Sequence, residues 1–149
     1  MLLSKEIAVE LNLTGLKLKQ YTAVMLKKSN IDLTPEQFLL IDLLWNHGPL
    51  SQQQLADMMQ KDKNSVTKLI DAIERKGFAV RNQNPVDRRS NTITLTLKAH
   101  DLKLSAKTTG IGMLNTILNG ISEEEQLSFL TTLRKLSENM TLQTVNDED

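Results

Sequence analysis

The two ends of the chain place hydrophobic residues three or four positions apart, which is the spacing of one face of an α-helix. The first stripe lies in residues 2–28, where Thr14 fills one step. The second follows the sequence SEEE at 122–125, which is typical of a helix start. These stripes predict long terminal helices whose apolar faces need another surface to cover them. They consist of Leu3, Ile7, Leu11, Leu18, Tyr21 and Met25, and of Leu127, Leu130, Leu133, Leu136 and Met140.

Shorter helices are predicted between the two stripes from their start and stop signals. Thr34 with Gln37, and Ser51 with Gln54, have the spacing of capping boxes. Gly77 stands where a helix commonly ends. The predicted helices cover residues 34–47, a short segment from 51, residues 62–76 and residues 98–119.

Residues 91–97 alternate Ile93, Leu95 and Leu97 with threonines, which is typical of a half-buried strand. Residues 78–83 form a second predicted strand, and the turn between the strands contains the sequence NPVD. Helices followed by such a hairpin have the element order of a winged helix-turn-helix. The expected fold class is therefore mainly α (α+β), with a winged helix-turn-helix lobe, a small antiparallel β-hairpin wing and long flanking helices at both ends.

Charge is distributed unevenly along a chain whose formal net charge is zero. Residues 61–90 hold eight basic and four acidic groups, so this segment carries +4 and the remainder −4. A local basic patch can steer a protein toward phosphates, although a solvated polar face is the alternative. The chain contains no cysteine, and the sequence has no apolar run long enough for a membrane span. A cytoplasmic protein with no membrane association is expected.

The predicted helix 62–76 separates an apolar face from a polar one. An α-helix fits the major groove of DNA, where short polar or cationic side chains reach base edges. The N-terminal half of this helix therefore predicts a DNA contact, with a merely solvated face as the alternative. The candidate residues are Lys63, Asn64, Ser65, Thr67 and Lys68.

Residues 50–97 resemble the DNA-binding core of the MarR family of transcription factors. The similarity rests on SVTKLI at 65–70, on ERKGF at 74–78, on Arg81 and above all on Asp87-x-Arg89 with Leu95-Thr96 downstream. The flanking helices resemble the family in order and length. The resemblance implies a DNA-binding region at 34–97 and a helical dimerisation region at 1–33 and 98–149.

The resemblance also implies a homodimer on a pseudo-palindromic operator whose half-sites are about 10 bp apart. Arg89 would enter the minor groove, Arg88 would lie near phosphates, and Asp87 would orient the wing by pairing with Arg75 or Arg88. The alternative role of Asp87 is turn formation.

Many relatives bind small, often anionic aromatic compounds and lose DNA affinity when they do. The resemblance therefore implies a repressor that a small aromatic or anionic effector releases from DNA. An effector pocket here would be lined by Tyr21, Met25, Phe38, Trp45 and Met113, although such a set is more often plain core. The two histidines, His47 and His100, and the lack of catalytic motifs favour neither a metal site nor an enzyme, and no cofactor is expected. The rival hypothesis is a winged-helix module that binds proteins and not DNA.

Overall fold

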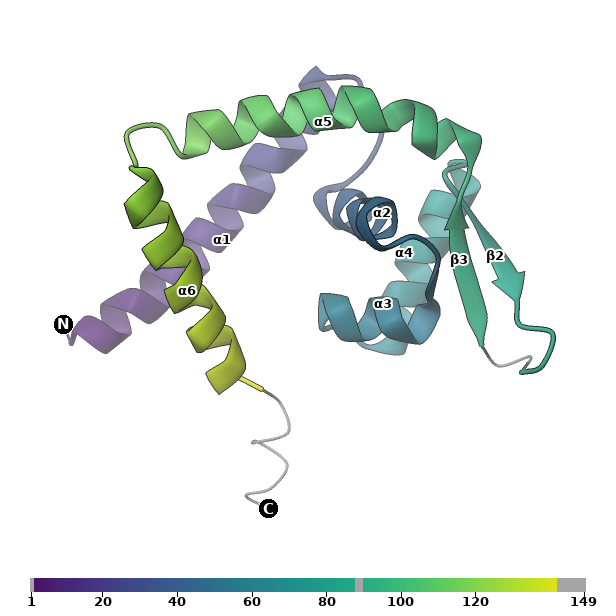
Figure 1. Cartoon of the computed structure of the whole chain (residues 1–149), viewed down its shortest axis with the longest axis horizontal. Helices are drawn as coiled ribbons and strands as arrows, with labels where there is room; N and C mark the ends of the chain where they lie inside the picture. Colours follow the sequence, from purple (N-terminus) through teal and green to yellow (C-terminus); the bar gives the residue numbers. More distant parts are fainter. Residues whose placement is uncertain (1, 88–89, 142–149) are drawn as a thin grey trace, which may run out of the picture. The chain divides into compact units, whose positions relative to one another are not determined.

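The computed structural model describes residues 2–87 and 90–141 (Figure 1). These residues group into two compact units, one up to Met113 and one from Leu114 onward. The boundaries proposed above for the functional regions, at residues 34 and 97, stay a prediction.

The first unit contains most of the secondary structure. In chain order it comprises α1 (Leu3–Lys28), α2 (Pro35–His47), β1 (Leu50–Ser51), α3 (Gln52–Met59), α4 (Lys63–Arg75), β2 (Ala79–Gln83), β3 (Asn91–Leu95) and most of α5 (Leu97–Ile117). The second unit contains α6 (Glu123–Asn139). The expected mainly helical fold with a winged helix-turn-helix lobe is confirmed.

The core of the first unit lies between α2, α3, α4 and the sheet (Figure 1). Each element contributes apolar side chains at the spacing of its buried face, and burial of such side chains is the main favourable term in folding. Ile70 and Ile73 of α4 pack there with Ile93 of β3, and all three are fully buried. The helix that carries the candidate DNA contacts is therefore fixed to the lobe along its opposite face.

The sheet has three antiparallel strands in the order β1-β3-β2. The β2–β3 hairpin is the predicted wing, with Ala79 opposite Leu95 and Gln83 opposite Asn91. The sequence did not predict β1, which pairs Leu50 with Ile93. A strand of two residues is too short to show an alternating pattern, and its partner lies more than forty residues away.

The helix ends follow the predicted capping signals. Both capping boxes form: the Gln37 and Gln54 amides donate to the hydroxyls of Thr34 and Ser51. Gly77 has a φ of 84°, a left-handed conformation that glycine adopts at little steric cost. The chain thus leaves α4 in a tight turn and enters β2 two residues later.

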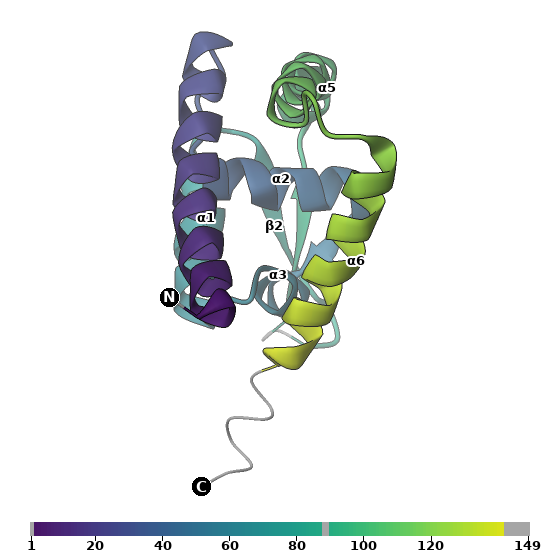
Figure 2. The ribbon, with the colours of Figure 1, turned by 90° about the vertical axis from the view of Figure 1, so that its left-hand side faces the viewer.

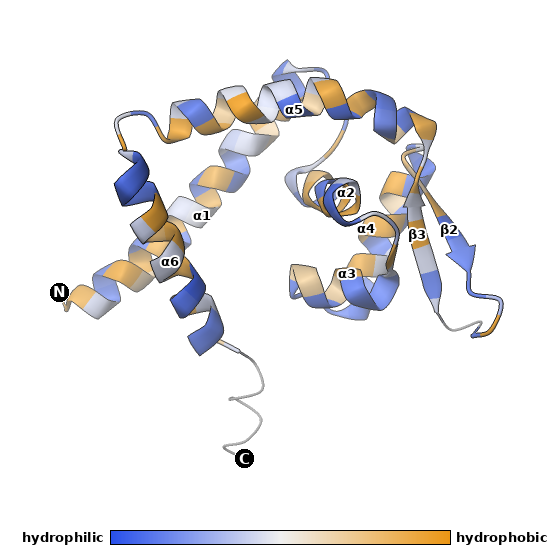
Figure 3. Cartoon of the chain, in the orientation of Figure 1, coloured by the Kyte–Doolittle hydropathy of each residue, from blue (hydrophilic) through white to orange (hydrophobic). Residues whose placement is uncertain are grey.

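The terminal helices leave large apolar surfaces uncovered. Helix α1 is one long uninterrupted helix (Figure 2). Within residues 3–28, Leu26 is its one buried side chain. Within residues 123–139, α6 has no buried side chain. Apolar residues nevertheless recur along each of these helices (Figure 3). Across the described ranges 2–87 and 90–141, none of the helices is both long and apolar enough to cross a membrane.

Candidate nucleic-acid interface

Helix α4 presents three uncommitted polar side chains at its N-terminal half. Lys63, Asn64 and Lys68 are exposed, and their side chains make no hydrogen bond or ion pair within residues 2–87 and 90–141. The opposite face of the helix is held in the core by Val66 and Ile70. This half of α4 therefore offers the ammonium groups of two lysines and the side-chain amide of Asn64 to an external partner.

Ser65 and Thr67, also predicted as DNA contacts, are already engaged within the lobe. The Ser65 hydroxyl donates to Asp62 Oδ2 at 2.9 Å. The Thr67 hydroxyl donates to the Lys63 carbonyl oxygen at 2.8 Å and accepts a hydrogen bond from Gln52 Nε2. Because each hydroxyl has a single proton, each could only accept from a base or present its carbon atoms. The structure thus separates the five candidates into three with unoccupied polar groups and two with occupied ones.

Asp62 is the N-cap of α4, and its carboxylate binds Ser65 twice. The Ser65 amide donates to Oδ1 at 2.8 Å, and the Ser65 hydroxyl donates to Oδ2. The hydrogen bond from the amide, followed by that from the hydroxyl, lowers the pKa of Asp62 below 3.8. A carboxyl group whose pKa is lower in the folded state stabilises the fold above its unfolded pKa. That contribution is lost as the pH falls through the lower, folded value.

We expect Asp62→Asn to reduce stability at pH 7, and to reduce it progressively less as the pH falls below the unfolded pKa of an aspartate. Asparagine keeps an N-cap acceptor but carries no charge for the helix N-terminus and does not titrate. Urea unfolding of both proteins at pH 7, 5 and 3 measures the difference in the free energy of unfolding. A difference that is the same at all three pH values would show that the ionised carboxylate has no part in the cap.

Arg81 joins the wing to α4, a role that the sequence did not reveal. Its guanidinium lies 2.5 Å from Asp71 Oδ1 and 3.1 Å from Glu74 Oε1 and donates to the Thr67 carbonyl oxygen at 3.2 Å. The Arg81 backbone amide donates to the same Glu74 carboxylate at 3.1 Å. Both carboxylates belong to α4, so this one residue of β2 fixes the orientation of the hairpin against α4.

The turn of the wing is organised by Asn84. Its side-chain oxygen accepts from the Val86 amide at 2.9 Å and the Asp87 amide at 3.3 Å, as in an Asx turn. The Ser90 amide donates to the Asp87 carbonyl oxygen at 3.1 Å. Arg88 and Arg89 lie outside the described residues, so their predicted DNA contacts stay predictions. The ion pairs among the described residues do not include one between Asp87 and Arg75.

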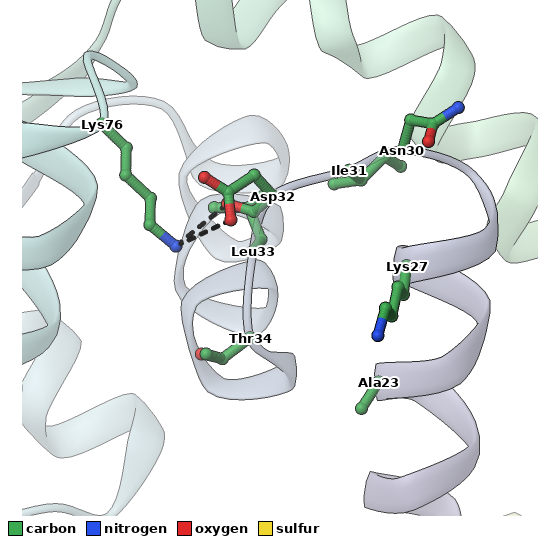
Figure 4. A pocket seen from close by; sticks show the side chains of 8 residues that line it. All are labelled: Ala23, Lys27, Asn30, Ile31, Asp32, Leu33, Thr34 and Lys76. Atoms are coloured by element: carbon green, nitrogen blue, oxygen red, sulfur yellow. Dashed lines mark hydrogen bonds and ion pairs between the residues drawn. The ribbon is translucent and has the colours of Figure 1, made fainter.

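The residues predicted to line an effector pocket make contacts typical of packing. The Phe38 and Trp45 rings meet edge to face with centroids 6.0 Å apart, and Trp45 Nε1 donates to the Ala99 carbonyl oxygen. The sulfur of Met113 accepts from the Thr22 hydroxyl at 3.8 Å. A hollow of about 450 Å³ lies elsewhere, lined by Ala23, Lys27, Asn30, Ile31, Asp32, Leu33, Thr34 and Lys76 (Figure 4). The predicted pocket around Tyr21 and Met25 stays a prediction.

The described residues contain no group of three or more histidine, aspartate or glutamate side chains placed to hold a metal ion.

Helices α2 to α4 and the β2–β3 hairpin define a winged helix-turn-helix protein. A model of the MarR family matches residues 33–91. The chain is 32% identical over 101 residues to YkoM, an uncharacterized HTH-type transcriptional regulator of Bacillus subtilis, the match covering 68% of this chain and 66% of that protein. It is 31% identical over 107 residues to YfiV, another such regulator of that organism, with 72% and 67% covered. A MarR protein from Peptoclostridium difficile has the same fold, with a TM-score of 0.83 at 20% identity and 93% and 92% covered.

The chain belongs to the MarR family. The matched part spans about two thirds of the length of the two curated relatives. Both are named as transcriptional regulators, which agrees with the expectation that the chain is not an enzyme.

Proposed function

We propose that the protein is a homodimeric transcriptional regulator that binds double-stranded DNA in the cytoplasm. The observation that carries the proposal is the exposed N-terminal half of α4, where Lys63, Asn64 and Lys68 have no partner among the described residues. In this arrangement α4 enters the major groove, where an asparagine can pair with adenine and a lysine can bind guanine or phosphate. The wing then lies over the neighbouring minor groove, with Arg89 as the residue that enters it and Arg88 near phosphates. AbfR, a protein of similar fold at 17% identity (TM-score 0.74), has been solved bound to DNA.

The uncovered apolar faces of α1 and α6 support a homodimer. The predicted stripe residues Leu3, Ile7 and Leu18 of α1 are all exposed, as are Leu127 and Leu130 of α6. Large contiguous apolar surfaces on a protein generally mark an interface. A symmetric dimer covers these faces and presents two α4 helices to the two half-sites of a pseudo-palindromic operator.

We propose that the protein represses transcription until a small aromatic or anionic effector releases it from DNA. MdtR of Bacillus subtilis, 27% identical over 131 residues, is named a transcriptional repressor. The organohalide-sensing regulator RdhR, similar in fold at 18% identity, has been solved with 2,4-dichlorophenol bound. Nothing in the residues around Tyr21, Phe38 or Trp45 specifies a particular compound.

The test of the proposal is binding of the purified protein to DNA from upstream of its own gene, against random duplex, over 0.05–0.3 M salt. Each phosphate that a basic side chain neutralises adds about −0.9 to the slope of log K against log[salt]. A steep slope, with binding to the upstream DNA at least ~1000-fold tighter than to random duplex, is expected for a specific regulator. Equal affinity for both DNAs at 0.15 M salt would reject the regulator and favour a protein-binding module.

We expect Asn64→Ala to relax the sequence preference and not to weaken all binding equally. A good contact to a base contributes roughly 1–3 kcal/mol of discrimination. Affinities for the operator and for single-base variants of each half-site measure the effect. Lys68→Ala is the comparison. If the Lys68 side chain binds only phosphate, this variant lowers the affinity for every DNA sequence and reduces the salt slope by about one. Uniform weakening by Asn64→Ala would place Asn64 among the phosphate contacts.

A further inference from the structure

Both ends of the recognition helix are bound to the same six residues, 32–37, which connect α1 to α2 and begin α2. Lys61 lies directly before the N-cap of α4, and Lys76 is its C-cap. Helix α4 has 13 residues and is about 20 Å long, so two lysines whose backbones lie at opposite ends of the helix reach the same short segment.

At the N-terminal end, Glu36 binds two lysines from different elements. Its Oε1 accepts from Lys61 Nζ at 3.3 Å and from Lys19 Nζ of α1 at 3.3 Å. Burial raises the pKa of Glu36, but the hydrogen bonds from Lys19 and Lys61 outweigh this and lower it below 4.5. Glu36 therefore carries its charge at neutral pH and links α1 to the turn that precedes α4.

At the C-terminal end, Lys76 crosses to residues 32–37 and binds three oxygen atoms there, two of which belong to Asp32 (Figure 4). Its Nζ donates to Gln37 Oε1 at 2.9 Å and to the Asp32 carbonyl oxygen at 3.0 Å, and lies 3.6 Å from Asp32 Oδ1. Gln37 is buried, and the Lys76 side chain is 28% exposed. A partly buried ammonium with this many acceptors is held more firmly than an exposed surface pair.

We propose that Lys76 and Glu36 are positioning residues that set the angle of the recognition helix relative to α1. The apolar core holds α4 by non-directional contacts, whereas the two polar links fix the positions of its two ends. Because α1 carries a large part of the apolar surface assigned to the dimer, these links connect the dimer to the angle of α4. The consequence for operator binding rests on the proposed function, whereas the positioning itself does not.

The Lys76→Met variant tests the link without leaving a buried polar atom unpaired. Methionine keeps the apolar stem, Gln37 Oε1 still accepts from the Thr34 amide at 3.2 Å, and the Asp32 side chain is exposed to water. Glu36→Gln removes the charge at the other end. Lys103→Met, on an exposed site of α5, is the matched control. All three variants are expected to keep cooperative unfolding.

The readout is the distance between spin labels at Gln20→Cys on α1 and Arg75→Cys on α4, in a chain with no cysteine of its own. Dilution with unlabelled protein restricts the measurement to pairs within one chain. We expect a narrow distribution in the parent and the Lys103→Met protein, and a broader or shifted one in Lys76→Met and Glu36→Gln. We also expect Lys76→Met to bind the operator roughly tenfold more weakly, a typical loss for a coupling residue, with nonspecific binding nearly unchanged.

Distance distributions that are the same in Lys76→Met, Glu36→Gln and the parent would overturn the positioning role, whatever the DNA affinities. Broadened distributions in a protein that binds no DNA specifically would instead reject the proposed function and support the positioning role. Reduced melting temperature with unchanged distances would show that the two links are merely stabilising, which also overturns the inference.

Discussion

The double substitution Ile7→Glu, Leu11→Glu is expected to convert the protein from a dimer into a monomer at micromolar concentration. Both side chains belong to the α1 stripe and are 45% and 37% exposed in the single chain. In the proposed dimer these positions lie in the interface, where an unpaired carboxylate loses its hydration. A cost of about 4 kcal/mol raises the dissociation constant roughly a thousandfold. Specific operator binding is weakened as the dimer dissociates, because a monomer binds one half-site and so has only part of the affinity.

Sedimentation equilibrium of the parent and the variant measures this effect directly. Leu39→Glu is the matched control, since Leu39 is a similarly exposed leucine on α2, outside both stripes. It should remain a dimer of about twice 16.8 kDa. The first unit should keep its fold in both variants, because Ile7 and Leu11 contribute nothing to its buried core. A parent protein that is itself monomeric at micromolar concentration would refute the dimer.

Local signals in the sequence were sufficient to predict most of the fold. The spacing of Thr34 with Gln37 and of Ser51 with Gln54 located two helix starts, because a capping box depends on residues three positions apart. Gly77 predicted the end of α4, because the turn that ends a helix often needs a left-handed φ that glycine adopts most easily. The alternation around Ile93 predicted the wing strand.

The interactions that the sequence did not reveal are those between distant segments. Strand β1 exists only because the fold brings Leu50 opposite Ile93. Lys76 reaches Asp32 and Gln37 across more than 35 residues, and no periodicity encodes that contact. Ser65 and Thr67 looked like free polar groups in the sequence, whereas their hydroxyls are bound to Asp62 and Lys63. The polar face of α4 was predicted correctly as a face, but its unoccupied members could be identified only from the structure.

Arg81 makes another contact that the sequence did not reveal, and replacing it should affect both stability and DNA binding. Asp71 and Glu74 precede it by ten and seven residues and meet it only when β2 folds back along α4. Arg81→Met keeps the stem but removes the planar guanidinium that binds both carboxylates and the Thr67 carbonyl oxygen. Because the carboxylates are partly exposed, we expect a loss of about 1–2 kcal/mol in the free energy of unfolding.

The effect of Arg81→Met on operator binding should exceed its effect on random duplex. Without this link the wing no longer keeps a fixed angle to α4, so binding both grooves at once requires ordering of the hairpin. We expect operator affinity to fall about tenfold, equivalent to roughly 1.4 kcal/mol. Arg81→Lys should recover part of the lost operator affinity, since the lysine ammonium restores the positive charge but not the planar guanidinium that binds two carboxylates. Arg75→Met, an exposed arginine at the end of the same helix, is the control for loss of positive charge. If Arg75→Met weakens operator binding as much as Arg81→Met does, the loss comes from charge alone and the wing is positioned by other contacts.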